Sequence, residues 1–183
     1  ENRQLNENLT NLQQENADLS SKASQYESEL NRLENSRMAL EDQLKGTGAT
    51  VRIKNGAVSV LLPGAILFDA GQTALRPQSK TTLKKIAGII KTETAGEIVR
   101  IEGHTDNDPI SRQKDKYKSN WELSAARAAA VLHYMVEECG VSPTKVYIAG
   151  FGQYQAMADN KSKTGKAKNR RVEFVIMPRG SGG

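Results

Sequence analysis

The sequence predicts an α+β protein: a two-layer sandwich with two main helices on one face of a small mixed sheet, preceded by a long N-terminal coiled-coil helix. Three observations carry this prediction. Leucines recur every seven residues through residues 2–45, Asn55-Gly56 separates two apolar runs, and later runs with strand periodicity alternate with two amphipathic helical runs. The 183 residues suffice for one ordinary domain and an appendage.

The charge is divided unevenly between these parts. Residues 1–46 contain five Lys/Arg and nine Asp/Glu, a net charge of −4, whereas residues 47–183 contain 21 and 12, a net charge of +9. A positive globular part favours anionic partners. The sequence has no run of about 18 uncharged apolar residues, so it contains no candidate membrane-spanning helix. Cys139 is the only cysteine, which excludes an internal disulfide.

A coiled-coil arm is predicted over residues 1–46. The heptad d positions hold Leu5, Leu12, Leu19, Tyr26, Leu33 and Leu40. Asn16 at an a position favours a parallel dimer, because each asparagine can bond its twin only in that register. Lys22 would then face Glu27 of the partner helix, whereas Glu29 and Glu34 would repel. A parallel homodimer is therefore expected, with antiparallel or higher-order packing left open.

Residues 47–64 are predicted to form a hinge and a β-hairpin. Gly46-Thr47-Gly48 has the composition of a helix end followed by a hinge. Asn55-Gly56 is the strongest short hairpin signal, and it lies between the runs Thr50–Lys54 and Ala57–Leu62. These two runs are the expected strands.

The globular domain is predicted over residues 65–178 and the flexible tail over 179–183. Pro77 opens the first helix at a position that proline favours, and Gly96 ends it. The second helix starts near Asn120, because Ser119 and Glu122 have capping-box spacing, and it runs to about Cys139. The expected strands are 98–102, 145–149 and 171–177, with loops over 105–118 and 150–168.

A charged pair is the first candidate for a site. Asp106 follows a strand end, and Arg127 lies two helical turns after Asn120, beside the apolar stripe, where an unpaired charge is costly. One interpretation is a structural salt bridge between the two. The other is a zwitterion site, in which the carboxylate binds an ammonium and the guanidinium binds a carboxylate. The residues by themselves leave both open.

Four motifs in order resemble the OmpA-like peptidoglycan-binding domain family. They are Gly103-His104-Thr105-Asp106-Asn107, the helix start Asn120-Trp121-Glu122-Leu123-Ser124-Ala125-Ala126-Arg127-Ala128, Gly150-Phe151-Gly152 and Asn169-Arg170-Arg171-Val172-Glu173. The resemblance covers roughly residues 57–177 and looks most like the MotB-type branch. It implies non-catalytic anchoring to the cell wall, through the diaminopimelate-containing stem peptide of peptidoglycan. The alternative is the wall-anchoring part of a MotB-like, ion-driven stator.

The resemblance also implies binding roles for eight residues. Asp106 matches the position that takes the ammonium of diaminopimelate, and Arg127 matches the position that takes its carboxylate. The other matched positions are Thr105, Asn120 and Leu123 around the pocket, Phe68 and Asp69 at its rim, and Arg171 near its base.

No cofactor, metal ion or nucleic acid is an expected partner. His104 and His133 lie on different elements without ligand spacing, and no glycine-rich phosphate loop is present. The basic run over residues 161–171 lacks the aromatic residues that stack bases; it is a solvated loop or a second contact with an anionic wall polymer. We expect membrane attachment only through sequence upstream of Glu1, in the periplasm or cell envelope of a Gram-negative-type bacterium.

Overall fold

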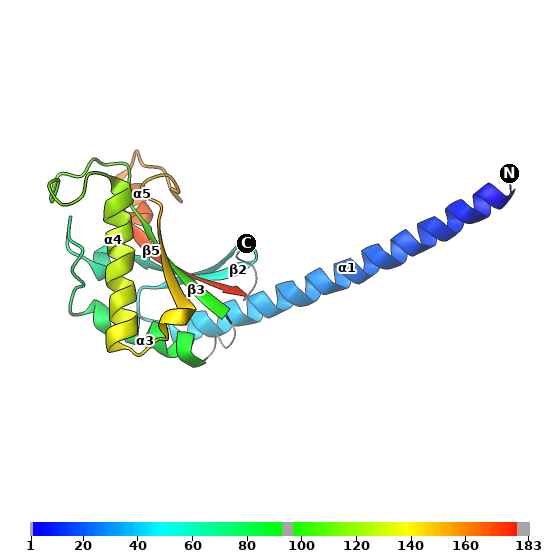
Figure 1. Cartoon of the computed structure of the whole chain (residues 1–183), viewed down its shortest axis with the longest axis horizontal. Helices are drawn as coiled ribbons and strands as arrows, with labels where there is room; N and C mark the ends of the chain where they lie inside the picture. The colour runs from blue at the N-terminus through cyan, green and yellow to red at the C-terminus, as the bar shows by residue number, and fades with distance from the viewer. Residues whose placement is uncertain (1, 93–96, 179–183) are drawn as a thin grey trace. The chain divides into compact units, whose positions relative to one another are not determined.

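The computed structural model of the protein describes residues 2–92 and 97–178. Contacts divide the chain into two compact units, Glu1–Ser36 and Arg37–Gly183. The first unit holds most of helix α1 (Asn2–Gln43), and the second holds its last turns together with a sheet and the remaining helices (Figure 1). The predicted tail over residues 179–183 lies outside the described residues.

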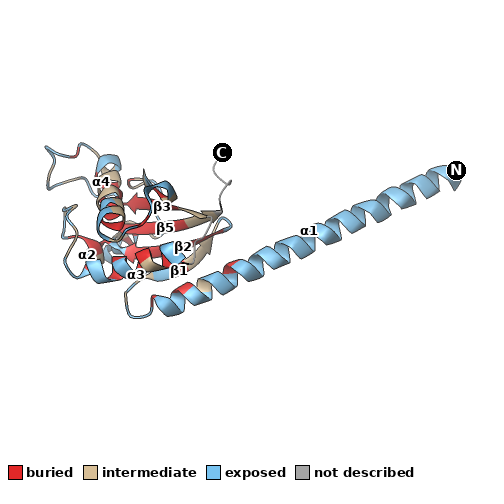
Figure 2. Ribbon diagram, turned by 60° about the horizontal axis from the view of Figure 1, so that its bottom comes forward, coloured by how far each residue is buried: buried red, intermediate tan, exposed pale blue. Residues whose placement is uncertain are grey.

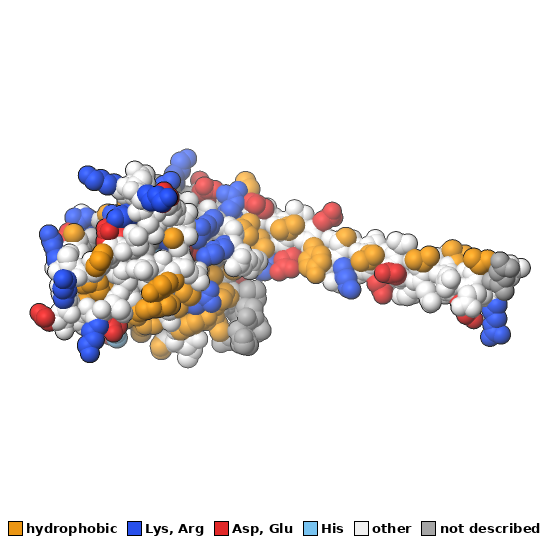
Figure 3. Space-filling model, turned by 90° about the horizontal axis from the view of Figure 1, so that it is seen from above, with side chains coloured by type: hydrophobic (Ala, Val, Ile, Leu, Met, Phe, Trp, Pro, Cys, Tyr) orange, Lys and Arg blue, Asp and Glu red, His pale blue; other side chains and the backbone are white. Residues whose placement is uncertain are grey.

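Helix α1 is uninterrupted, and its apolar positions as far as Leu30 are open to solvent (Figure 2). Leu5, Leu9, Leu12, Leu19 and Tyr26 are between 55% and 66% exposed. Figure 3 shows hydrophobic side chains recurring along this helix. An apolar stripe of this length favours pairing with another helix. The predicted long helix is confirmed, and its partner stays a prediction.

The predicted hairpin is confirmed at the start of the sheet. Strand β1 (Thr50–Lys54) pairs antiparallel with β2 (Ala57–Pro63), with Lys54 opposite Ala57. The two turn residues, Asn55 and Gly56, have φ values of 52° and 71°. Asparagine and glycine tolerate this left-handed conformation, which a two-residue hairpin turn requires.

The sheet has five strands in the order β1-β2-β5-β3-β4. Strand β3 (Glu97–His104) pairs in parallel with β4 (Val146–Gly150), and the other pairs, including those of β5 (Arg171–Pro178), are antiparallel. Parallel neighbours need a crossover, which the helical segment between β3 and β4 supplies. The predicted small mixed sheet is confirmed.

Two helices cover one face of this sheet, as predicted (Figure 1). Helix α3 (Ser79–Thr92) buries one apolar stripe, and the predicted end of this helix at Gly96 lies outside the described residues. Helix α4 (Asn120–His133) begins with the predicted capping box and continues as a π-helical turn, Tyr134–Glu138. Gly140, with φ at 68°, follows its end.

Helix α4 packs very closely on the ends of β3 and β4. A Cβ atom on Gly103 would lie 2.0 Å from the carbonyl oxygen of Ser124, and one on Gly150 would lie 2.7 Å from the Cβ of Ala125. Neither distance is possible for real side chains, so both positions require glycine. The start of α4 is thereby held against the sheet edge from which Thr105 and Asp106 emerge.

Two short helices differ from the prediction. Helix α2 (Gly64–Leu67) occupies the brief apolar run before Phe68, and α5 (Lys163–Asn169) lies within the stretch predicted to be a loop. Ser162 caps α5 by accepting a hydrogen bond from the Gly165 amide at 3.0 Å. The lysines and the glycine of α5 carry no apolar periodicity, so the pattern could not indicate this helix.

None of the helices in the described part of the chain combines the length and apolar character needed to cross a membrane.

Candidate functional site

A pocket of about 430 Å³ opens in the globular unit where β3 ends and α4 begins. Its walls come from α2 and the turn after it, from the loop after β3, from the inner side of α4, and from Arg170 just before β5. The lining residues are Gly64, Ala65, Phe68, Asp69, Ala70, Gly71, Arg76, Thr105, Asp106, Asp108, Pro109, Ile110, Ser111, Arg112, Asn120, Leu123, Arg127 and Arg170. Seven of the eight residues singled out from the sequence are among them.

Asp106 lies in the loop just after β3 and is 6% exposed. The neighbouring Thr105 amide donates to the Gly152 carbonyl at 2.9 Å, which fixes the backbone as it leaves β3. The Asp106 carboxylate accepts a hydrogen bond from the Asp108 amide at 3.2 Å and forms an ion pair with Arg170. Asp106 therefore pairs with Arg170 and not with Arg127, the partner that the salt-bridge interpretation assumed.

Arg127 projects from α4 into the same pocket and is 8% exposed. Its Nε donates to the Gln72 carbonyl at 3.1 Å, and its guanidinium carbon lies 5.3 Å from the centre of the Phe68 ring. Among the described residues, no carboxylate lies within ion-pair distance of it. Burial lowers the pKa of Arg127, and the charge of Asp106 partly opposes this effect. A buried guanidinium of this kind is prepared to receive a carboxylate.

Asn120 joins the two sides of the pocket. Its side-chain amide donates to the carbonyls of Asp106, at 3.4 Å, and Asp108, at 3.0 Å, and to Oε1 of Gln153, at 3.0 Å. Leu123, one turn further along α4, adds a buried apolar surface. As the spacing predicted, Asn120 and Arg127 lie on the same side of the helix.

The rim is formed by the segment after α2. Phe68 is buried beneath Arg127, and the Asp69 carboxylate pairs with Arg76 at 2.9 Å. The Gly64 amide donates to the Arg170 carbonyl at 2.7 Å, so the start of α2 is bound to the residue that holds Asp106.

The charges that line the pocket do not balance. The lining holds the carboxylates of Asp69, Asp106 and Asp108 and four arginines. Each carboxylate already has a cation, because Asp69 pairs with Arg76, Asp106 with Arg170, and Asp108 with Lys166 at 2.5 Å. The pocket is left with uncompensated positive charge, and Arg127 is its buried part.

Arg171 is not among the lining residues. It is 3% exposed, its Nε lies 2.5 Å from Glu173, and its other nitrogens donate to the carbonyls of Asn169 and Gln155. The residue that reaches the pocket is its neighbour Arg170, which the sequence analysis named only within a motif and a basic run. Adjacent side chains at a strand start point to opposite sides, and this alternation was the available signal.

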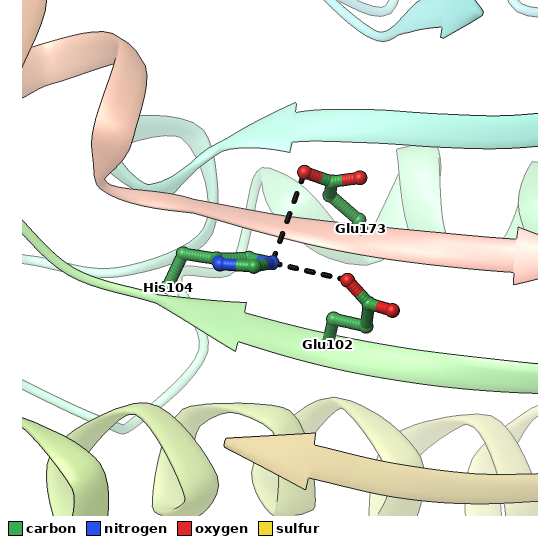
Figure 4. Close-up of side chains that lie close together, drawn as sticks. All are labelled: Glu102, His104 and Glu173. Atoms are coloured by element: carbon green, nitrogen blue, oxygen red, sulfur yellow. Dashed lines mark hydrogen bonds and ion pairs between the residues drawn. The ribbon is translucent and has the colours of Figure 1, made fainter. Parts of the chain in front are cut away.

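A second buried polar cluster lies on the sheet, formed by Glu102, His104 and Glu173 (Figure 4). Nε2 of His104 is 3.2 Å from Glu102 and 3.7 Å from Glu173. Their ligand atoms lie within 4.8 Å of one another, close enough to suggest a metal site. However, Glu102 already pairs with Arg100 at 2.6 Å, and Glu173 with Arg52 at 2.8 Å and with Arg171. With three guanidinium groups against two carboxylates, a dication would be repelled.

The cluster instead forms an ion-pair network whose pKa values follow from its geometry. Burial by itself would raise the pKa of Glu173, but Arg171 and Arg52 lower it to about 2. Burial by itself would also raise the pKa of Glu102. The hydrogen bonds from His104 and Arg100 outweigh this effect, so the pKa of Glu102 is lowered. Burial lowers the pKa of His104. The sequence pattern did not indicate this network.

A protein-family model described as the OmpA family matches residues 67–170. Motility protein B of Bacillus subtilis is 32% identical over 142 residues, which cover 78% of this chain and 50% of that protein. The chain therefore spans about half the length of this curated relative.

Solved structures give the same result. The periplasmic domain of Helicobacter pylori MotB is 27% identical, with a TM-score of 0.67, over 74% of this chain and 82% of that one. The cell wall anchor of the T6SS from Pseudomonas aeruginosa is 30% identical, with a TM-score of 0.66, over 76% of this chain and 94% of that one. The matched family segment includes the lining residues of the pocket from Phe68 to Arg170. On these grounds, the chain belongs to the OmpA family, with relatives among MotB-type proteins.

Proposed function

We propose that the pocket binds the stem peptide of peptidoglycan through diaminopimelate, and that the protein is a non-catalytic anchor to the cell wall. The observation that carries this proposal is Arg127, a buried guanidinium that lines the pocket without a carboxylate partner among the described residues. A similar solved structure is named a cell wall anchor, which supports the proposal.

The zwitterionic centre of diaminopimelate matches the charges of the pocket. Its carboxylate would accept hydrogen bonds from the terminal nitrogens of Arg127, since Nε is already used by the Gln72 carbonyl. Its ammonium would approach Asp106, in competition with Arg170. Leu123 and Phe68 supply an apolar surface for the methylene chain between them.

The test is a pull-down with purified sacculi of two chemical types. We expect the protein to bind sacculi whose stem peptides contain diaminopimelate, and to bind far less to sacculi that contain lysine, which lacks the side-chain carboxylate. Asp106→Asn and Arg127→Ala should abolish binding while leaving the circular dichroism spectrum unchanged. Arg3→Ala, an exposed arginine at the far end of α1, is the matched control. Equal retention of both mutants and the wild type would refute the site.

We further propose that α1 pairs in parallel with α1 of a second copy, in the periplasm or cell envelope of a Gram-negative-type bacterium. The exposed leucine stripe and Asn16 support this arrangement. Two linked pockets on one polymer would gain avidity through effective concentration.

A second candidate is the wall-anchoring part of an ion-driven stator, and the similarity to motility protein B favours it. The sequence upstream of Glu1 separates the two. A transmembrane helix with an acidic residue would favour the stator, and a lipid-attachment or secretory signal would favour the plain anchor.

A further inference from the structure

Trp121 and Tyr154 form a stacked pair on the surface of the globular unit. Their ring centres are 5.0 Å apart with an interplanar angle of 23°, yet Trp121 is 47% and Tyr154 65% exposed. Aromatic rings of this size usually contribute buried surface. We infer that this pair is a binding platform for a sugar ring of the glycan strand, next to the peptide pocket. The inference rests on the proposed function and extends it to a second part of the same polymer.

The platform is held in place without help from a ligand. Trp121 belongs to the first turn of α4, and the loop after β4 that carries Tyr154 is bound to that turn. The Gly152 amide donates to the hydroxyl of Ser124 at 2.9 Å. A Cβ on Gly152 would lie 3.2 Å from the backbone nitrogen of Trp121, so the loop lies close against this turn. The two rings are therefore prepared for stacking, and binding need not order them.

The platform is continuous with the pocket wall. Asn120, which lines the pocket, directly precedes Trp121, and its side chain bonds Gln153, which directly precedes Tyr154. Consecutive Cα atoms are about 3.8 Å apart. In peptidoglycan the diamino acid is the third residue from the sugar, which is a span of roughly 10 Å for an extended peptide. A bound stem peptide therefore brings its own sugar within reach of these rings.

The chemistry of the pair favours a sugar over a protein surface. One face of a pyranose ring consists of C–H groups, which pack flat on an aromatic ring, while its hydroxyls stay in water. Because the two rings are stacked on each other, a sugar can lie on the outer face of one ring, an area on the order of 100 Å², against the ~800 Å² that each partner buries in a typical protein interface. The stack is thus large enough for a sugar and too small for a partner protein.

The experiment uses Trp121 as its own reporter, since it is the only tryptophan of the chain. Three probes are titrated against the full chain: the stem peptide, the same peptide attached to its disaccharide, and a neutral trimer of N-acetylglucosamine. We expect the disaccharide-peptide to bind about five- to tenfold more tightly than the peptide and to change the Trp121 fluorescence. The sugar trimer should give the same spectral change at much higher concentration.

Substitution of Tyr154 keeps the reporter and removes half of the platform. Tyr154→Ala should eliminate the affinity difference between the two peptide ligands and leave binding of the free peptide unchanged, whereas Tyr154→Phe should retain the difference. Equal affinities in the wild type would overturn the platform. An unchanged affinity difference between the two peptide ligands in Tyr154→Ala would also overturn it. The same holds if Tyr154→Ala changes only the sedimentation of the protein, because that result would indicate a protein contact. Failure of the free peptide to bind would instead refute the proposed function.

Discussion

The buried carboxylate of Glu173 offers a direct test of the ion-pair network that joins β1, β2 and β5. Its side chain is fully buried and contacts Arg171, Arg52 and the Ser59 hydroxyl, at 2.5, 2.8 and 3.1 Å. Glu173→Gln keeps the size of the side chain and removes its charge. The substitution leaves buried Arg171 without its carboxylate, a change that typically costs about 3–5 kcal/mol. We therefore expect a large loss of unfolding free energy at pH 7.

The pH dependence follows from the same contacts. The folded-state pKa of Glu173 is lowered from 4.5 to about 2, which corresponds to about 3 kcal/mol of stability. Because the pKa is lowered, this contribution is complete above pH 4.5 and is lost as the pH falls towards 2. About 2 kcal/mol of it should be gone at pH 3. The lowered pKa values of Glu102 and His104 act in the same direction, with the loss from His104 beginning below its ordinary value of 6.5.

The measurement is urea unfolding at pH 7, 5 and 3, followed by the fluorescence of Trp121, which reports on the globular unit. The free-energy difference between the wild type and Glu173→Gln should narrow by about 2 kcal/mol from pH 7 to pH 3. Exposed Glu138→Gln, the same substitution outside the Glu173 network, is the control.

Parallel pH curves for the wild type and Glu173→Gln would refute the reasoning, because they would mean that Glu173 has the same pKa in the folded and unfolded states. If Glu173→Gln is too unstable to measure, Arg52→Gln removes a partner that is 28% exposed. It should flatten the same part of the curve to a smaller degree.

Three further outcomes are expected. Gly103→Ala should lower the unfolding free energy by about 2 kcal/mol or more in urea unfolding, since its Cβ would meet a backbone carbonyl of α4 at 2.0 Å; a wild-type midpoint would contradict this. Arg170→Gln should tighten peptide binding up to about fivefold in calorimetry, because Asp106 would lose a competing cation, and weaker binding would instead assign Arg170 to the ligand. Leu19→Asp should convert a dimer to a monomer in sedimentation of the full chain, whereas Ser21→Asp, off the heptad stripe, should not; a dimer that survives Leu19→Asp would argue against the coiled coil.

Much of the fold was predictable because its signals are local. Three such signals depend only on residues close together in the sequence: the heptads of α1, the Asn55-Gly56 turn and the Ser119–Glu122 capping box. Apolar alternation likewise indicated β3 and β5, and the order of the elements then restricted the sheet to few topologies. Helix α5 was missed because seven residues rich in lysine carry no such periodicity.

The sequence by itself also indicated that Asp106, Asn120 and Arg127 could lie together, since Asp106 follows a strand end and the other two are two helical turns apart; all three line the pocket. Only the tertiary structure decided how their charges are paired. Asp106 pairs with Arg170, which is 64 residues away, and the contact depends on β5 lying beside β3 in the sheet. Arg171 lies two residues before Glu173 on β5, so the two share a face of that strand and pair away from the pocket. Among the described residues, Arg127 is left as the buried cation of the pocket without a carboxylate. Periodicity determines which side of an element a residue occupies, whereas partners distant in sequence are determined by which elements pack together.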